Sequence, residues 1–180
     1  HGRDGRRRGS GDRLMNAHVA LETGRVFRGR LIGAPKGAGG ELVFHTGMTG
    51  YQEILTDPTY AWQVIVFTAS HIGNYGIHGT DHESKGIHPA AVVVRDFCRR
   101  TFHRTRATSL DEILRRAGVP AITGVDTRAL TTAIRDGGNC RAWLGTGDPD
   151  ELVARARALP PIGDVDWVAG VTCDAPWDFD

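Results

Sequence analysis

The stretch QVIVFT at residues 63–68, together with its later counterpart AAVVVR at residues 90–95, decides the fold class of this 180-residue chain. Both runs are continuous, apolar and rich in β-branched side chains. Strands that bury only one face alternate between apolar and polar residues, whereas continuous apolar runs are typical of strands covered on both faces. The two runs therefore predict two central strands with other elements packed on either side.

The segments before these runs predict further strands. Residues 17–22 and 25–29 have the composition of strands, and Thr23-Gly24 between them predicts a hairpin turn. Residues 33–40 are rich in glycine and predict a loop, and residues 41–45 predict another short strand.

The second half of the chain carries helix signals. Three segments begin with capping residues, or with proline at the first helical position, which predicts helices that start near Ser109, Asp126 and Asp148. Residues 119–125 and 140–144 predict strands between them. The apolar side of the second helix is formed by Leu130, Ala133 and Ile134. Strands first and alternating helices and strands later favour a layered α/β or α+β domain with helices on one face.

Composition excludes several classes of protein. Hydrophobic residues make up 40% of the chain and charged residues 24%, which is typical of a globular domain. No apolar run approaches the ~18 residues of a membrane span.

The cysteines, Cys98, Cys140 and Cys173, are odd in number and widely spaced, which favours a reducing compartment over a disulfide framework. Cys98 lies beside Arg99 and Arg100, neighbours that lower a thiol pKa, but an ordinary half-buried cysteine is the preferred interpretation.

The charge of the chain is unevenly distributed. The formal net charge is +1, and five Arg against two Asp in residues 1–13 leave −2 for the rest. This pattern predicts a flexible basic arm over residues 1–14 and excludes a whole-chain polycation. Nucleic-acid binding by the arm is disfavoured, because no aromatic residue accompanies the arginines to stack on bases.

Motifs that usually carry catalysis or metal binding are weak. The glycine-rich loops lack the lysine and the third glycine that phosphate-binding loops require, and the chain has no G-x-S-x-G turn. One cluster of potential metal ligands comprises His78, His82, His88, Asp81 and Glu83. Because glycines interrupt this cluster, a solvated polar loop is preferred over a metal site.

The most unusual segment is MTGYQEILTDPTY at residues 48–60. Its Asp-Pro pair predicts a tight turn, followed by the hydroxyls of Thr59 and Tyr60. A hydroxyl beside a rigid turn can hydrogen-bond a small polar ligand, although the residues alone favour a turn without a ligand. A second segment, HIGNYG at residues 71–76, predicts a tight backbone with Asn74 as a buried polar anchor.

Five segments complete the sequence pattern. They are TGMTGYQEILTDPTY (46–60), HIGNYG (71–76), DHES (81–84), VVVRD (92–96) and GVDTRALTTAIRDGG (124–138). In their order and spacing they resemble the signatures of one family, the small subunit of glutamine-dependent carbamoyl phosphate synthetase. The resemblance covers about residues 15–172.

The resemblance implies a fold and a set of partners. The fold would be the family's three-layer β/β/α swivelling domain over residues 15–160, with residues 161–180 as a linker towards a C-terminal glutaminase domain. The implied partners are the large subunit in a heterodimer, a glutaminase domain in cis or in trans, and glutamine. The implied location is cytoplasmic, with no membrane and no nucleic acid involved.

The resemblance also implies that this domain is non-catalytic. The family's catalytic Cys, His and Glu lie in the glutaminase domain, so this chain alone would not hydrolyse glutamine. No metal ligand or cofactor is implied here, because ATP and Mg²⁺ act in the large subunit, whose product feeds arginine and pyrimidine synthesis. One position is carried over: Thr59 matches a serine that contacts bound glutamine, keeping the hydroxyl and adding a methyl group.

Four positions depart from the family pattern. Gly47 replaces a serine, Ser70 a proline, Ala91 a glycine and Thr132 an arginine. These departures bear on the standard contacts with the large subunit. They leave a second hypothesis open, that the chain is a divergent stand-alone binding or regulatory module that keeps the fold without amidotransferase activity.

Overall fold

The two apolar runs become strands β4 and β5, which pair with each other in parallel. The structure, a computed structural model, describes residues 14–77, 81–98, 108–173 and 175. In this part of the chain seven strands close into a barrel in the order β1-β2-β6-β5-β4-β3-β7. Their bounds are β1 Asn16–Leu21, β2 Val26–Gly33, β3 Ala38–His45, β4 Gln63–Phe67, β5 Ala91–Val94, β6 Pro120–Thr123 and β7 Cys140–Gly145.

The described residues also contain four α-helices and three short 3₁₀ helices. The α-helices are α1 Tyr51–Thr56, α2 Leu110–Arg116, α3 Thr127–Gly137 and α4 Pro149–Ala158. The 3₁₀ helices are η1 Pro58–Tyr60, η2 Ile162–Asp164 and η3 Val168–Gly170. Among the described residues, no helix is both long and apolar enough to span a membrane.

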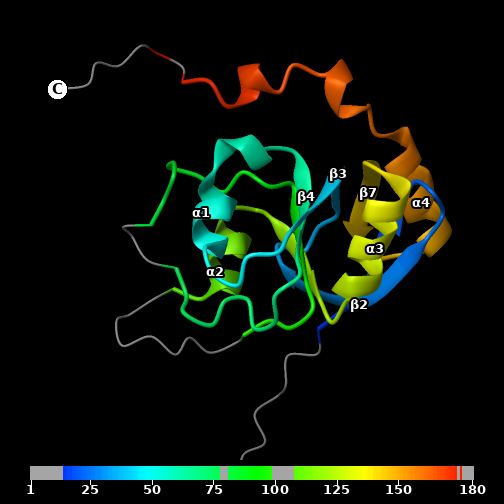
Figure 1. The fold of residues 1–180 in the computed structure, drawn as a ribbon, viewed down its shortest axis with the longest axis horizontal. Helices are drawn as coiled ribbons and strands as arrows, with labels where there is room; N and C mark the ends of the chain where they lie inside the picture. Colours follow the sequence, from blue (N-terminus) through cyan, green and yellow to red (C-terminus); the bar gives the residue numbers. More distant parts are fainter. Residues whose placement is uncertain (1–13, 78–80, 99–107, 174, 176–180) are drawn as a thin grey trace, which may run out of the picture.

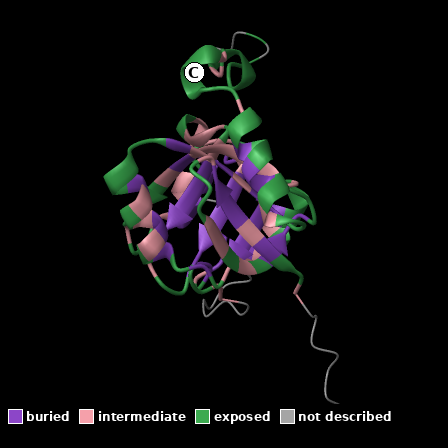
Figure 2. Cartoon of the chain, turned by 90° about the vertical axis from the view of Figure 1, so that its right-hand side faces the viewer, coloured by how far each residue is buried: buried purple, intermediate pink, exposed green. Residues whose placement is uncertain are grey.

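Burial confirms that β4 and β5 are covered on both faces. Residues 64–67 and 91–94 are fully buried, and Figure 2 shows buried residues gathered in the strands. Alternate side chains of these strands enter two different hydrophobic cores. Val64 and Val66 join a core to which all seven strands contribute, the barrel interior, and Leu130 and Ile134 of α3 pack into it. Their neighbour Ile65 instead joins the core outside the barrel. The period of two residues along a strand therefore explains how one continuous apolar run supplies both cores.

The helices cover different parts of the barrel. Helices α1 and α2 pack on the outer core, with Leu55 and Leu114 fully buried there, and α2 lies against β2 and β6. Helix α4 packs on β1 and β7 instead, through Leu152 and Val153. The expectation of helices on a single face therefore differs from the structure, because closure of the sheet gives each helix its own sector. The result is a mixed α/β domain with a sheet-dominated core, compatible with the predicted α+β class.

The predicted loop at residues 33–40 is partly wrong, because β2 extends to Gly33 and β3 begins at Ala38. A Cβ atom on Gly40 would lie 1.8 Å from the carbonyl oxygen of Trp62. One on Gly39 would lie 2.6 Å from the Trp143 ring. These glycines therefore serve close packing within a strand, a use that composition alone does not distinguish from a loop.

Candidate functional site

The candidate site is the turn η1, which follows α1 and carries Thr59. The Asp57 side chain accepts a hydrogen bond from the Thr59 backbone N–H at 2.8 Å, and the Asp57 carbonyl accepts one from Tyr60 N–H at 3.1 Å. The predicted turn is therefore present, and Thr59 is exposed on it. Within the described part of the chain, the Thr59 hydroxyl makes no hydrogen bond and remains available to a ligand.

Helix α1, which leads into the turn, is held at its start by the second unusual segment. Gly50, with φ of 83°, caps the helix and donates its N–H to the Tyr75 hydroxyl at 2.9 Å. The Tyr51 hydroxyl donates to the Gly76 carbonyl at 2.8 Å, and the Tyr51 and Tyr75 rings stack with centroids 4.2 Å apart. Asn74, predicted as a buried anchor, is exposed, so Tyr75 and not Asn74 holds the helix.

The surroundings of the two tyrosine hydroxyls further disfavour their ionisation. Burial raises the pKa of Tyr51 and of Tyr75 above the ordinary value for a phenol. A protonated Tyr75 can accept from Gly50 and still carry its own proton. The start of α1 is therefore insensitive to pH across the neutral range.

The end of α1 is held by the DHES segment. The Thr56 hydroxyl donates to the Gln52 carbonyl at 2.9 Å and accepts from the Glu83 N–H at 2.9 Å. The Ser84 hydroxyl donates to the Thr56 carbonyl at 2.7 Å and lies 2.6 Å from His88 Nε2. Segments that are distant in sequence thus fix both ends of the helix that carries the turn.

The histidine cluster does not form a ligand set in the described structure. His82 is exposed, and His88 bonds to Ser84. His78 lies outside the described residues. Among those described, no group of three or more His, Cys, Asp or Glu side chains is arranged to hold a metal ion.

Cys98 and Cys140 have the surroundings of structural residues, whereas Cys173 is exposed. Burial raises the pKa of the Cys98 thiol, and the charge of Asp96 raises it further. The neighbours Arg99 and Arg100 lie outside the described residues. Cys140 is buried, and its thiol pKa is raised chiefly by that burial. Thiols with raised pKa values are poor nucleophiles at neutral pH.

A C-terminal strap, residues 159–173, runs from α4 across the top of the barrel to the turn (Figure 1). Trp167 of the strap packs on Trp62, with ring centroids 5.1 Å apart, and donates its indole N–H to the Ile162 carbonyl at 2.6 Å. A hollow of about 200 Å³ beside Thr59 is lined in part by the strap residues Trp167 and Val168. The strap therefore forms one wall of the surface that Thr59 faces.

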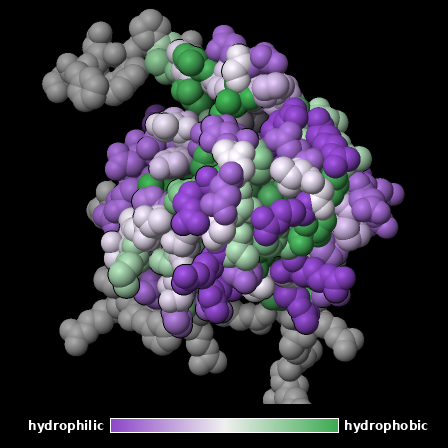
Figure 3. All heavy atoms as spheres, turned by 45° about the vertical axis from the view of Figure 1, so that its right-hand side comes forward, coloured by the Kyte–Doolittle hydropathy of each residue, from purple (hydrophilic) through white to green (hydrophobic). Residues whose placement is uncertain are grey.

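The strap presents apolar side chains to solvent. Val168 is 69% exposed, and Val171 and Ile162 are also exposed. Figure 3 shows hydrophobic residues gathered along this segment at the top of the molecule. The sequence analysis interpreted residues 161–180 as a linker and did not predict the packing of Trp167 on Trp62. The two tryptophans lie far apart in sequence, so no local pattern pairs them.

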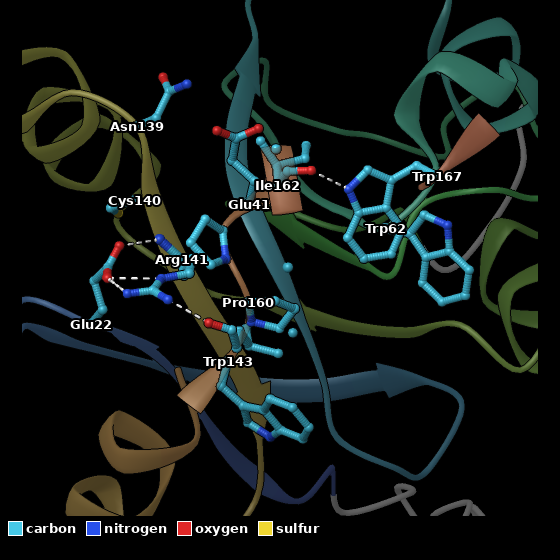
Figure 4. Close-up of a pocket in the computed structure, with 15 residues that line it drawn as sticks. Glu22, Glu41, Trp62, Asn139, Cys140, Arg141, Trp143, Pro160, Ile162 and Trp167 are labelled. Atoms are coloured by element: carbon cyan, nitrogen blue, oxygen red, sulfur yellow. Dashed lines mark hydrogen bonds and ion pairs between the residues drawn. The ribbon is translucent and has the colours of Figure 1, made fainter. Parts of the chain in front are cut away.

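A larger cavity of about 590 Å³ lies between the strap, β3 and β7 (Figure 4). In its wall Arg141 donates two side-chain hydrogen bonds to the Glu22 carboxylate and a third to the Leu159 carbonyl. The Glu22 carboxylate also accepts the Arg141 backbone N–H at 2.7 Å. The pair therefore ties the β1 end, β7 and the root of the strap together.

The pair predicts a pH-dependent contribution to stability. Hydrogen bonds from Arg141 lower the pKa of Glu22 below its ordinary value of 4.5. A group with a lowered folded-state pKa contributes stability above its unfolded pKa, and that contribution is lost as the pH falls through the folded value. We expect Glu22→Gln to lower the free energy of unfolding by about 1–2 kcal/mol at pH 7. This difference should shrink as the pH falls below the ordinary value of 4.5 and vanish only below the lowered folded-state pKa.

Urea unfolding at pH 7 and at pH 3 measures this difference. Glu112→Gln is the matched control, because Glu112 forms an exposed pair with Arg116 within one helix. It should change stability by less than about 0.5 kcal/mol. An equal destabilisation by Glu22→Gln at both pH values would contradict the assigned role of the ion pair.

The family departures lie in different environments. A Cβ atom on Gly47 would lie 2.4 Å from His45 Nε2, so the His45 ring occupies the space that a serine would need. Ser70 and Thr132 are exposed, whereas Ala91 is fully buried in β5. Nothing in the structure explains the choice of residue at Ser70 or Thr132.

The fold and the site define an α+β barrel domain that presents one braced, exposed turn next to the start of β4. The family model for the carbamoyl-phosphate synthase small chain, CPSase domain, matches residues 19–144. The chain belongs to this family.

Curated relatives agree with this assignment. The carbamoyl phosphate synthase small chain of Methanosarcina acetivorans is 46% identical over 164 residues, which cover 90% of this chain and 45% of the relative. That of Nitratidesulfovibrio vulgaris is 44% identical over 168 residues, covering 92% and 45%. The chain thus spans less than half the length of these relatives. Among solved structures, an aminopeptidase from Aneurinibacillus sp. strain AM-1 superposes on 73% of this chain. The superposed part is 30% of the aminopeptidase chain, and the two sequences are 14% identical. Its TM-score of 0.42 is too low to carry an argument.

Proposed function

We propose that this chain is the non-catalytic N-terminal domain of a glutamine-hydrolysing carbamoyl phosphate synthase small chain, and that Thr59 contacts glutamine. The observation that supports this role is the bracing of α1. Tyr75, Gly76, Glu83 and Ser84 fix the helix that presents Thr59. Segments that the family shares are thus used to hold an exposed hydroxyl in place.

The finer parts of the proposal follow from the family. The domain is of the swivelling type and packs on the large subunit in a heterodimer. A glutaminase domain, in cis or in trans, supplies the catalytic Cys, His and Glu and delivers ammonia for carbamoyl phosphate synthesis. We assign no cofactor to this chain, because ATP and Mg²⁺ act in the large subunit. The assembly works in the cytoplasm, in arginine or pyrimidine synthesis.

Replacing Thr59 tests the proposed contact. In a synthetase assembled with large subunit and glutaminase domain, Thr59→Val keeps the side-chain shape and removes the hydroxyl. One lost hydrogen bond should raise the KM for glutamine about three- to tenfold. Ammonia-driven synthesis should be unchanged, because it does not use the glutamine site. Steady-state kinetics with each nitrogen donor separate the two effects.

Thr59→Ser is the matched control for this variant. It keeps the hydroxyl and should leave the KM for glutamine within about twofold of the parent. Equal KM values for Thr59→Val and the parent would show that the Thr59 hydroxyl does not contact glutamine. A parallel loss with ammonia would indicate a structural defect instead.

Binding experiments separate the proposed role from the stand-alone alternative. The 180-residue chain should bind the large subunit or the glutaminase domain at micromolar concentration in calorimetry, and should release no ammonia from glutamine by itself. If it binds neither partner, the proposal fails and a divergent binding or regulatory module becomes the better interpretation. Ammonia release by the isolated chain would contradict its assignment as non-catalytic.

A further inference from the structure

The cavity between the strap, β3 and β7 has the dimensions of a small-molecule site and is separate from the Thr59 hydroxyl. Its volume of about 590 Å³ lies within the range of 300–1,000 Å³ that is usual for ligand pockets. Its walls are mostly apolar, with a few charged groups. Trp167, Pro160 and Ile162 of the strap lie opposite Arg141 and Trp143 of β7 (Figure 4).

Close packing fixes the β3 wall of this cavity. Gly39 and Gly40 let Trp143 and the Trp62 backbone approach β3 more closely than any side chain would permit. Trp167 is held by its bond to the Ile162 carbonyl and by Trp62. The aromatic wall is therefore formed before any ligand arrives, which reduces the entropic cost of binding.

The charged groups of the cavity disfavour an anion. Arg141 has its guanidinium hydrogen bonds directed to Glu22 and to the Leu159 carbonyl. Glu41 stands opposite Arg141 in the β3–β7 ladder. In the described part of the chain, however, Glu41 forms no ion pair. Among the lining residues, two carboxylates against one guanidinium give a net negative charge, and the nearby Arg155 guanidinium lies over the Trp143 ring.

The excess of carboxylates over guanidinium groups among the lining residues favours a positively charged group in the cavity. An aromatic face adds attraction for a cation, and the Trp indole is the strongest of these faces.

We propose that this cavity binds a small organic cation, a guanidinium or ammonium group on an aliphatic stem. The Glu41 carboxylate pairs with the cationic head, while Trp167 and the strap prolines cover the stem. The proposal concerns a site other than the glutamine contact and does not depend on the proposed function.

The test compares n-butylguanidinium with n-butylurea on the 180-residue chain. The two molecules have nearly the same shape and differ in charge, so the comparison isolates the electrostatic part of binding. Titration calorimetry, together with tryptophan fluorescence, should show the cation binding at least about tenfold more tightly than the urea, with affinity falling as sodium chloride is added. Discrimination below threefold overturns the proposal.

Variants then locate the bound cation. Glu41→Gln should reduce the affinity for n-butylguanidinium about tenfold and leave that for n-butylurea unchanged. Trp167→Leu should weaken both, because it removes aromatic surface from the wall. Glu151→Gln is the matched control, because Glu151 occupies an exposed position of α4 outside the cavity. This variant should bind both molecules as the parent does. Unchanged cation binding in Glu41→Gln would overturn the assignment of this site.

Discussion

Replacing Leu130 with alanine is expected to lower the free energy of unfolding by about 3–4 kcal/mol. Leu130 packs in the barrel interior core, and 0% of its surface is accessible to solvent. Removing its side chain forfeits buried apolar surface and leaves a cavity that rigid strands cannot fill by moving inward.

Thermal unfolding measures this effect. For a domain of this size, about 2–4 °C are lost for each kcal/mol, so the melting temperature should fall by roughly 6–16 °C. Leu130→Met nearly conserves the volume and should cost less than about 1.5 kcal/mol. A fall of less than about 2 °C for Leu130→Ala would show that α3 does not pack into the barrel as described.

Replacing Gly40 with alanine is the second large effect that we expect, about 3 kcal/mol of destabilisation. The new Cβ atom would lie 1.8 Å from the Trp62 carbonyl oxygen, so β3 and the Trp62 backbone must separate. Trp62 has φ of 65°, a left-handed conformation that a tryptophan adopts only when its surroundings impose it. The substitution should therefore also disturb the packing of Trp62 on Trp167.

Two measurements report on the Gly40 variant. Urea unfolding gives the loss of stability, and near-ultraviolet circular dichroism follows the tryptophan pair. Gly137→Ala is the matched control, because its Cβ atom would meet nothing within 4 Å at the end of α3. We expect the control to be neutral or to stabilise the helix by up to about 1 kcal/mol. A Gly40 variant as stable as the control would contradict the close approach of β3 to the Trp62 backbone.

Local sequence signals predicted most of the regular elements. The helix starts are confirmed, since Ser109, Asp126 and Asp148 each accept a hydrogen bond from a backbone N–H of the first turn. A capping side chain acts on residues two or three positions away, so its effect is readable from a few letters. Helix α1 was not predicted, because it has six residues, a glycine cap and no side-chain cap bond.

The candidate site was predicted only in part. The Asp-Pro turn followed from the segment itself, whereas the choice of Thr59 as a ligand contact came from the family resemblance. The bracing of that turn did not, because Tyr75 and Ser84 reach α1 from segments whose own spacing says nothing about where they fold. The cavity beside Glu41 was missed entirely, since it is bounded by β3, β7 and the strap.

Two continuous apolar runs, three capped helices and an ordered set of motifs were enough to establish an α+β domain and its family from the amino-acid sequence. These features depend on interactions between residues close along the chain, or on the burial pattern of one strand. Closure of the sheet through the β1–β7 pair, the packing of α3 into the barrel and the Trp62–Trp167 contact were decided only by tertiary structure. Each joins segments far apart in sequence, and what joins them is the requirement to bury apolar surface and pair strand edges, which a local pattern does not encode.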